Sequence, residues 1–104
     1  MTVFIVQEPT RQVAGVPRPS MDLSPAQEFG ELEFMLPPGP VMFNPVPMKA
    51  RLKASLSKFS DDDYLMCIGD PTAMVWAGIY AAQANHNNVK MLKWNRSTRK
   101  YVIV

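Results

Sequence analysis

The sequence predicts an α/β protein with a small mixed sheet of about five strands, two main helices and a C-terminal β-hairpin. The apolar run at residues 64–68 is bounded by turn residues at 69–72, which is typical of a buried strand. An alanine-rich segment and a second apolar run, at residues 89–94, follow it. This spacing favours two parallel strands joined by a right-handed helical crossover. We therefore expect this strand–helix–strand unit at the centre of the sheet.

The chain of 104 residues is long enough to fold as one domain, so we expect a single domain over residues 1–104. Residues 10–21 contain a glycine and two prolines within a stretch that lacks usable periodicity, and we expect an exposed loop there. The single cysteine, Cys67, lies within an apolar run. We expect it to be a small buried hydrophobe in a reducing compartment.

The first third of the chain predicts two strands and one helical turn. Residues 3–6 are β-branched or aromatic and predict a buried strand that ends at Pro9. Residues 24–27, Ser-Pro-Ala-Gln, have the form of a capping box with proline at the first helical position. Residues 31–36 alternate acidic and apolar side chains, as a strand with one wet face does. No basic region precedes the first apolar run, so neither a signal peptide nor a membrane span is expected.

An amphipathic helix is expected over residues 46–59, because Leu52, Leu56 and Phe59 fall at positions i, i+4 and i+7. Asn44 is expected to open it before two prolines, which the first helical turn tolerates. Residues 60–63, Ser-Asp-Asp-Asp, then precede the buried strand. Ligands in open α/β sheets bind beyond the carboxyl ends of the strands, so we expect solvated, turn-forming acids and no metal site.

The long helix is expected over residues 72–85, with Asp70 as its N-cap and Pro71 at its first position. Its small side chains share one side, which lets the helix approach a sheet or another helix closely: Ala73, Ala77, Ala81 and Ala84. Four residues rich in asparagine, 85–88, are a natural helix stop.

Catalysis is not expected. His86 is the only histidine, and a helix of about 16 residues separates it from Asp70 by roughly 24 Å. Without a histidine at the Asp70 edge, neither a Ser-His-Asp triad, a Cys-His pair nor a histidine–metal site forms there. We therefore expect a protein that is not an enzyme and that uses no cofactor.

The C-terminal hairpin concentrates the residues of an interaction surface. Two cations oppose five anions up to Met48, whereas nine cations oppose four anions from Lys49 onward. Residues 90–104 contain five cations and no anion. The predicted binding residues combine the side-chain types that dominate protein interfaces with a further cation: Trp94, Arg96, Arg99, Tyr101 and Lys93. The plainer alternative is a solvated edge that discourages aggregation.

Two other binding functions remain open. A nucleotide or another anion could bind where the strand turns into the long helix, at Gly69, Asp70, Thr72 and Ser97. The signal is weak because no glycine-rich phosphate motif is present and the Asp70 carboxylate would repel a phosphate. A nucleic acid could bind the basic hairpin and stack on its aromatic rings.

Several segments together resemble a group of short tailed-bacteriophage proteins to which no activity is attached. The resemblance rests on Asp-Asp-Asp-Tyr-Leu at 61–65, Ile-Gly-Asp-Pro at 68–71, the alanine-rich helix with Asn85, and Lys-Met-Leu-Lys-Trp-Asn-Arg at 90–96. The opening residues 4–9 and residues 22–26 are similar too. The resemblance implies a phage origin and a bacterial host cytoplasm, and it brings no catalytic residues.

We therefore expect a small, non-enzymatic phage-encoded protein that binds a host or defence component through its basic C-terminal hairpin. The expected partner is a host or phage protein, with nucleic acid as an alternative and no membrane. A homodimer is a further option, through the small-residue side of the long helix or an open sheet edge.

Overall fold

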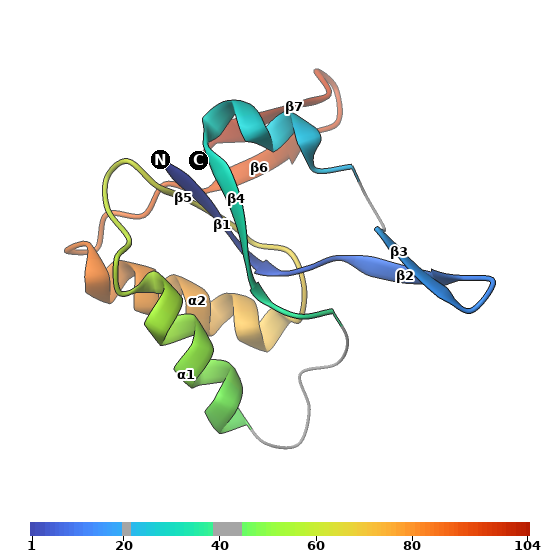
Figure 1. The fold of residues 1–104 in the computed structure, drawn as a ribbon. Coiled ribbons are helices and arrows are strands. Elements are labelled where there is room, and N and C mark those ends of the chain that lie inside the picture. Colours follow the sequence, from blue (N-terminus) through green and yellow to red (C-terminus); the bar gives the residue numbers. More distant parts are fainter. Residues whose placement is uncertain (20–21, 39–44) are drawn as a thin grey trace.

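The computed structural model of the chain describes residues 1–19, 22–38 and 45–104. Its centre is strand β1 (Thr2–Gln7), the middle strand of a three-stranded parallel sheet in the order β4-β1-β5. β4 (Glu31–Leu36) and β5 (Tyr64–Met66) flank it, so that Ile5 lies opposite both Phe34 and Met66. Figure 1 shows two helices on one side of this sheet and a shorter helix with a hairpin on the other.

β1 is buried on both faces because it lies between these two layers. Its four central residues, Val3, Phe4, Ile5 and Val6, are all essentially inaccessible to solvent. Phe4 and Val6 pack into the core under the two long helices, and Val3 and Ile5 pack into the opposite core. A continuous apolar run of this kind is what a strand covered on both faces requires.

The helical layer consists of α1 (Pro45–Leu56) and α2 (Pro71–Ala84). Leu52 and Leu56 of α1 are fully buried, and Phe59, just after the helix, places its ring 5.8 Å from the ring of Phe4. The predicted amphipathic helix is confirmed, although it ends three residues earlier than expected. Asn44, its predicted opening residue, lies outside the described residues.

α2 packs against both α1 and β1, and the side that is fully buried carries small side chains. Ala73, Ala77 and Ala81 are fully buried, as predicted, and therefore cannot form a dimer interface on the folded protein. The helix stop is confirmed as well, since His86 and Asn87 adopt positive φ values of 52° and 67°. Neither α2 nor any other helix of the described residues has the length and apolar character to cross a membrane.

The second layer is formed by the 3₁₀ helix η1 (Ser24–Phe29) and a hairpin of β6 (Leu92–Asn95) and β7 (Lys100–Ile103). Leu92 and Tyr101 of the hairpin share a core with Val3 and Ile5. The predicted capping box is wrong, because Leu23 occupies the N-cap position without a side-chain bond. Instead, the carboxylate of Asp22 accepts a hydrogen bond from the Ser24 N–H at 2.9 Å.

The predicted strand–helix–strand unit exists, but it lies to one side of the sheet. β5 meets the segment before β6 through a single parallel bridge between Leu65 and Met91, where Leu65 N–H donates to the Lys90 carbonyl at 2.9 Å. The hairpin then continues over the face that carries η1. The central strand is β1, because it is the strand whose apolar residues serve both cores. The α/β class and the C-terminal hairpin are confirmed. The three parallel strands and the two hairpin strands make up the five that were expected, although they belong to two separate sheets.

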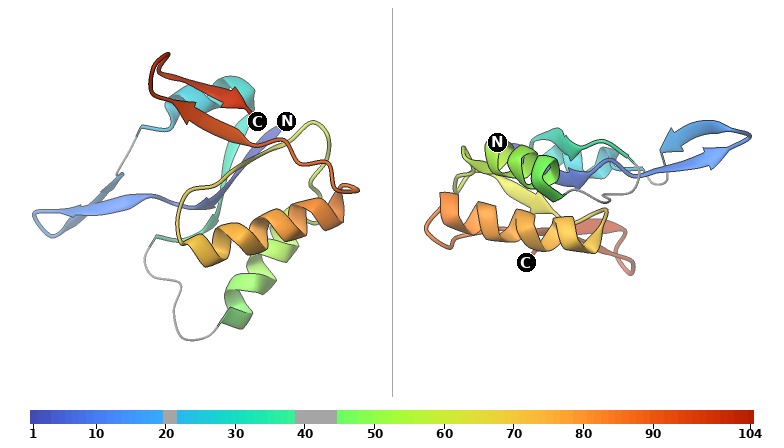
Figure 2. Two further views of the ribbon diagram at one scale, coloured as in Figure 1. Left: turned by 180° about the vertical axis from the view of Figure 1, so that it is seen from behind. Right: turned by 90° about the horizontal axis from the view of Figure 1, so that it is seen from below.

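Residues 10–19 form an antiparallel hairpin of β2 (Thr10–Val13) and β3 (Val16–Pro19) instead of the expected loop. Ala14 and Gly15 make its turn with φ values of 54° and 77°, the sign that a tight hairpin turn requires. Prolines are compatible with β3 because an isolated two-stranded ribbon has free edges. Both views in Figure 2 show this hairpin projecting from the rest of the chain.

Candidate functional site

The β6–β7 hairpin presents its loop in a fixed conformation. The side-chain oxygen of Asn95 accepts hydrogen bonds from the N–H groups of Ser97 at 2.9 Å and Thr98 at 3.3 Å. The N–H of Arg99 donates to the Asn95 carbonyl at 2.8 Å, and Arg99 adopts a φ of 54°. Arg96 and Arg99 therefore extend into solvent from a loop that is already ordered by its own bonds.

Trp94 lies opposite Tyr101 across the two strands. The two rings meet edge to face with their centroids 5.0 Å apart. Tyr101 is buried, whereas Trp94 is 40% exposed. An edge-to-face pair restricts both rings, so the exposed part of Trp94 is presented without much side-chain freedom.

A pocket of about 770 Å³ lies beside this pair. Its walls come from three segments: the end of β5, the hairpin with the residues that flank it, and the start of η1. The first wall consists of Met66, Cys67 and Ile68. The hairpin wall consists of Met91, Leu92, Lys93, Trp94, Tyr101 and Val104. The third consists of Asp22 and Pro25, so the lining is mostly apolar.

Cys67 is exposed at this pocket and is not the buried hydrophobe that the sequence predicts. The apolar run to which it belongs forms a strand only as far as Met66, so Cys67 lies beyond the last ladder position. Burial of its thiol against the pocket wall is nevertheless sufficient to raise the pKa of Cys67 above its ordinary value. The thiol therefore stays protonated at neutral pH.

Two other lining groups also have shifted pKa values. Burial raises the pKa of Tyr101, and the negative charge of Asp22 raises it further. The hydrogen bonds from Ser24 lower the pKa of Asp22. At neutral pH the lining therefore carries the Asp22 carboxylate and the neutral phenol of Tyr101.

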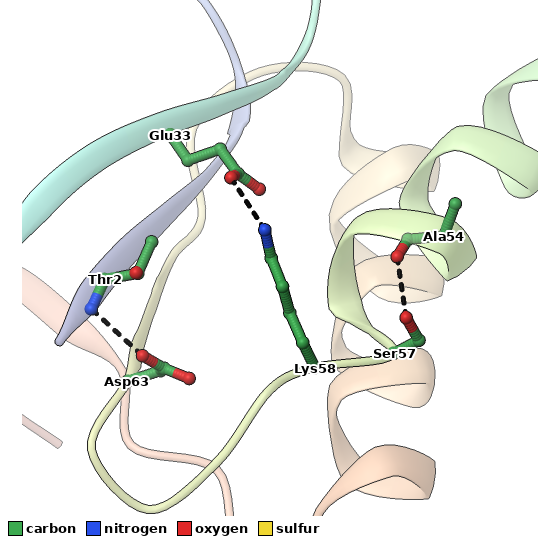
Figure 3. Close-up of polar contacts among 6 residues, drawn as sticks. All are labelled: Thr2, Glu33, Ala54, Ser57, Lys58 and Asp63. Carbon is green, nitrogen blue, oxygen red and sulfur yellow. Dashed lines mark hydrogen bonds and ion pairs between the residues drawn. The ribbon is translucent and has the colours of Figure 1, made fainter.

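The cations of the hairpin have no carboxylate partner within the described part of the chain. Among the described residues, the ion pair between side chains joins Lys58 to Glu33 at 3.2 Å, away from the hairpin (Figure 3). Lys90 lies over the ring of Tyr64, 4.4 Å from its centroid, and is half-buried. The other four, Lys93, Arg96, Arg99 and Lys100, are exposed. Their charge is therefore available to a partner.

The strand–helix turn is arranged differently from the predicted anion edge. Asp70 is the N-cap of α2, as predicted, and its carboxylate accepts the Ala73 N–H at 3.1 Å. The N–H of Ala73 is therefore not free to bind an anion. Asp70 N–H in turn donates to the side-chain oxygen of Gln7 at 2.9 Å.

The structure brings only some of the predicted site residues together. The pocket lining given above includes Lys93, Trp94 and Tyr101 among the predicted binding residues. Arg96 and Arg99 belong to the hairpin loop beyond it, and so does Ser97 of the predicted anion edge. The sequence analysis did not predict the apolar residues of the pocket, because their sequence pattern is that of ordinary core residues. They line a pocket only because the hairpin turns away from the end of β5.

The aspartate run before β5 also differs from its prediction. Asp63 is 8% exposed, and its carboxylate accepts hydrogen bonds from the N–H groups of Thr2 and Ser60, both at 2.9 Å. Figure 3 shows Asp63 joined to the first strand in this way. The prediction of a solvated acid is therefore wrong for Asp63, which is a structural residue. No group of three or more metal-ligating side chains occurs in the described ranges.

Fold and site together define a small α/β protein that carries a cationic, aromatic hairpin beside an apolar pocket. A model of the phage Pam3 gp32-like protein family matches residues 1–104. The chain belongs to this family, and the predicted resemblance to phage proteins is confirmed. No curated protein and no solved structure matches it.

Proposed function

We propose that this phage protein is a non-enzymatic binding protein that engages a host or phage protein through its β6–β7 hairpin. One observation carries the proposal: the partly exposed Trp94 borders an apolar pocket and is followed by the exposed cations Arg96 and Arg99. Aromatic and arginine side chains around a central apolar site are the composition of a binding hot spot. The phage family supports an interaction inside the infected bacterium, and we propose the cytoplasm as its compartment.

The rigidity of the hairpin supports this function. Association costs conformational entropy when side chains and loops become ordered at an interface. Here Tyr101 already restrains Trp94, and Asn95 already restrains the loop. Much of that ordering cost has therefore been met during folding, and more of the contact energy remains for affinity.

The charge of the hairpin indicates what kind of partner it meets. Five cations and no anion within residues 90–104 create a positive field around the hairpin. Such a field attracts an acidic surface, accelerates its approach and disfavours basic competitors. We therefore expect the partner to be acidic where it contacts the hairpin.

The titratable groups of the pocket favour binding over catalysis. A nucleophilic cysteine requires a lowered pKa, whereas burial raises the pKa of Cys67. The phenol of Tyr101 is likewise held in its neutral form by burial and by Asp22. Groups whose reactive forms are disfavoured are poor candidates for general-base or nucleophilic chemistry.

A nucleotide at the strand–helix turn and a nucleic acid on the hairpin are the competing functions. At the turn, the Asp70 carboxylate already occupies the helix N-terminus, where a phosphate would have to bind. A nucleic acid would use the same hairpin cations as a protein partner, but the salt dependence of the affinity distinguishes the two kinds of partner. If about five phosphates are contacted, affinity falls by several hundredfold over a few-fold rise in salt.

The test is capture of partners from bacterial lysate, with nuclease treatment and at two salt concentrations. Tagged wild-type protein is compared with the charge-reversed hairpin variant Arg96→Glu/Arg99→Glu. The matched control is Arg51→Glu/Lys53→Glu on α1, because these two cations are also exposed. Small molecules released on denaturation are analysed in parallel.

The proposal predicts a stoichiometric protein that survives nuclease and moderate salt, that the hairpin variant loses and that the α1 variant keeps. Loss of a captured protein from both variants would show that overall charge, rather than the hairpin, is responsible. Recovery of a nucleotide alone, or of material removed by nuclease, would replace the proposal with one of the two competing functions.

A further inference from the structure

The pocket beside Trp94 has the size of a ligand site rather than of a packing defect. Its volume of about 770 Å³ falls within the range of sites that bury a drug-sized ligand. One inserted side chain would leave much of that space unfilled. Two large apolar side chains on a short segment of chain would occupy it better.

The walls of the pocket suit apolar side chains of variable shape. Met66 and Leu92 are buried and form part of its floor, and Met91 is partly buried beside them. Methionine has three rotatable bonds and a polarisable sulfur, so a lining that contains two methionines can adapt to its occupant. Trp94 adds a flat ring that is 40% exposed.

The charges around the pocket are unequal. Lys93 lies in the hairpin wall, and Arg96, Arg99 and Lys100 follow it as exposed cations. The wall at η1 carries one carboxylate, Asp22, which accepts a hydrogen bond from the Ser24 N–H at 2.9 Å. An occupant with acidic residues is therefore attracted from the hairpin side and repelled at the η1 side.

From this combination we infer that the pocket receives two large apolar side chains from a short acidic segment of the protein partner. This inference rests on the proposed function and specifies which chemistry that partner presents. In an extended segment, side chains two positions apart point to the same side, so two apolar residues separated by an acidic one match the site. The acidic residues then lie at the rim of the pocket, where the exposed cations of the hairpin attract them.

A probe peptide tests the inference without knowledge of the partner. The probe is acetyl-Asp-Phe-Glu-Leu-Glu-amide, titrated into the full chain while methyl and indole NMR signals are followed. Two control peptides replace either both apolar residues by alanine or all three acids by lysine. We expect the probe to shift the signals of Met66, Met91 and the Trp94 indole, and each control to bind at least about tenfold more weakly.

Two variants test the predicted orientation. Asp22→Asn keeps an acceptor for the Ser24 N–H but removes the charge at the η1 side, so it is expected to tighten binding of the probe. Lys93→Glu is expected to weaken it by about tenfold. Equal binding of all three peptides, shifts confined to other surfaces, or no shift at millimolar peptide would overturn the inference. Self-association of the chain that masks these signals would also overturn the inference, because a second copy of the chain would then occupy the pocket.

A second measurement separates this inference from the proposed function. Cys67→Trp places a large side chain on the pocket wall, and Cys67→Ser is its small control. If the lysate partner is lost by Cys67→Trp but kept by Cys67→Ser, the pocket is part of the interface. If both keep it while the hairpin charge reversal loses it, the proposed function stands and the pocket inference fails. Circular dichroism checks that each variant is folded.

Discussion

The carboxylate of Asp63 accepts a hydrogen bond from the backbone N–H of Thr2 at 2.9 Å, although 61 positions separate the two residues in the chain. This bond ties the turn before β5 to the first residue of β1. The same carboxylate also accepts the N–H of Ser60 at 2.9 Å and its hydroxyl at 3.0 Å. Asp63 is largely buried, and through these bonds it holds the turn before β5 against the start of β1.

Asp63→Ala should therefore lower the free energy of unfolding by about 2–3 kcal/mol, since it removes these bonds and leaves the Thr2 N–H without its acceptor. The control is Asp62→Ala at the exposed neighbouring position, which should change stability by less than about 0.5 kcal/mol. Urea unfolding followed by circular dichroism measures both. Equal losses in the two variants would show that charge, and not the bond to Thr2, is what matters.

Gly69→Ala should be strongly destabilising. Gly69 adopts a φ of 124°, and a β-carbon there would lie 2.4 Å from the β-carbon of Gln7. Gln7 also accepts the Asp70 N–H, so displacement of its side chain would disturb the start of α2. We expect a loss of about 2 kcal/mol or more in the same urea assay. A variant as stable as the wild type would mean that this turn differs from the one described.

Gly78→Ala should have the opposite effect. Gly78 lies in the interior of α2, and a β-carbon there would meet no atom within 4 Å. Alanine is favoured over glycine within a helix by about 1 kcal/mol, so stability should rise by up to that amount. A loss of stability would reveal close packing against this position of α2, for example by a second copy of the chain.

The Cys67 thiol should react slowly at neutral pH. Burial raises its pKa in the folded chain, so the reactive thiolate forms only at a higher pH than in the unfolded chain. Alkylation rates measured from pH 7 to pH 10, with and without denaturant, should show this shift. By linkage, the native thiol contributes stability that is fully present below the unfolded pKa and is lost as pH rises through the folded pKa. Coincident pH profiles would contradict the placement of Cys67 against the pocket wall.

Local sequence signals predicted the regular elements well where one signal dominated. Asp70 followed by a proline defined the start of α2, and the alanines at 73, 77 and 81 identified its buried side. The acidic and apolar alternation placed β4 at residues 31–36, but the expected division into a buried face and a wet face is wrong, because Phe34 is 40% exposed and the adjacent Met35 and Leu36 are both buried. These features depend on residues close together in the chain, so a single sequence reveals them.

Contacts between residues far apart in the chain were harder to predict from the sequence. The buried state of Asp63 depends on Thr2, and the exposure of Cys67 depends on where pairing with β1 ends at Met66. The β2–β3 hairpin was not predicted, because prolines such as those in β3 are more typical of a loop than of a strand. The pocket arises where the hairpin diverges from β5 after a single bridge at Leu65, and nothing local marks that path.

If the hairpin face is a protein-binding surface, the ring of Trp94 contributes to the affinity for the captured partner, which titration calorimetry measures. The comparison is between Trp94→Ala and Trp76→Ala, which alters the chain's other tryptophan, on α2. We expect Trp94→Ala to weaken binding by about thirtyfold or more, equivalent to about 2 kcal/mol, while Trp76→Ala leaves the affinity of the folded protein nearly unchanged. Unaltered affinity in Trp94→Ala, or an equal loss in both variants, would contradict a protein-binding role for the hairpin face.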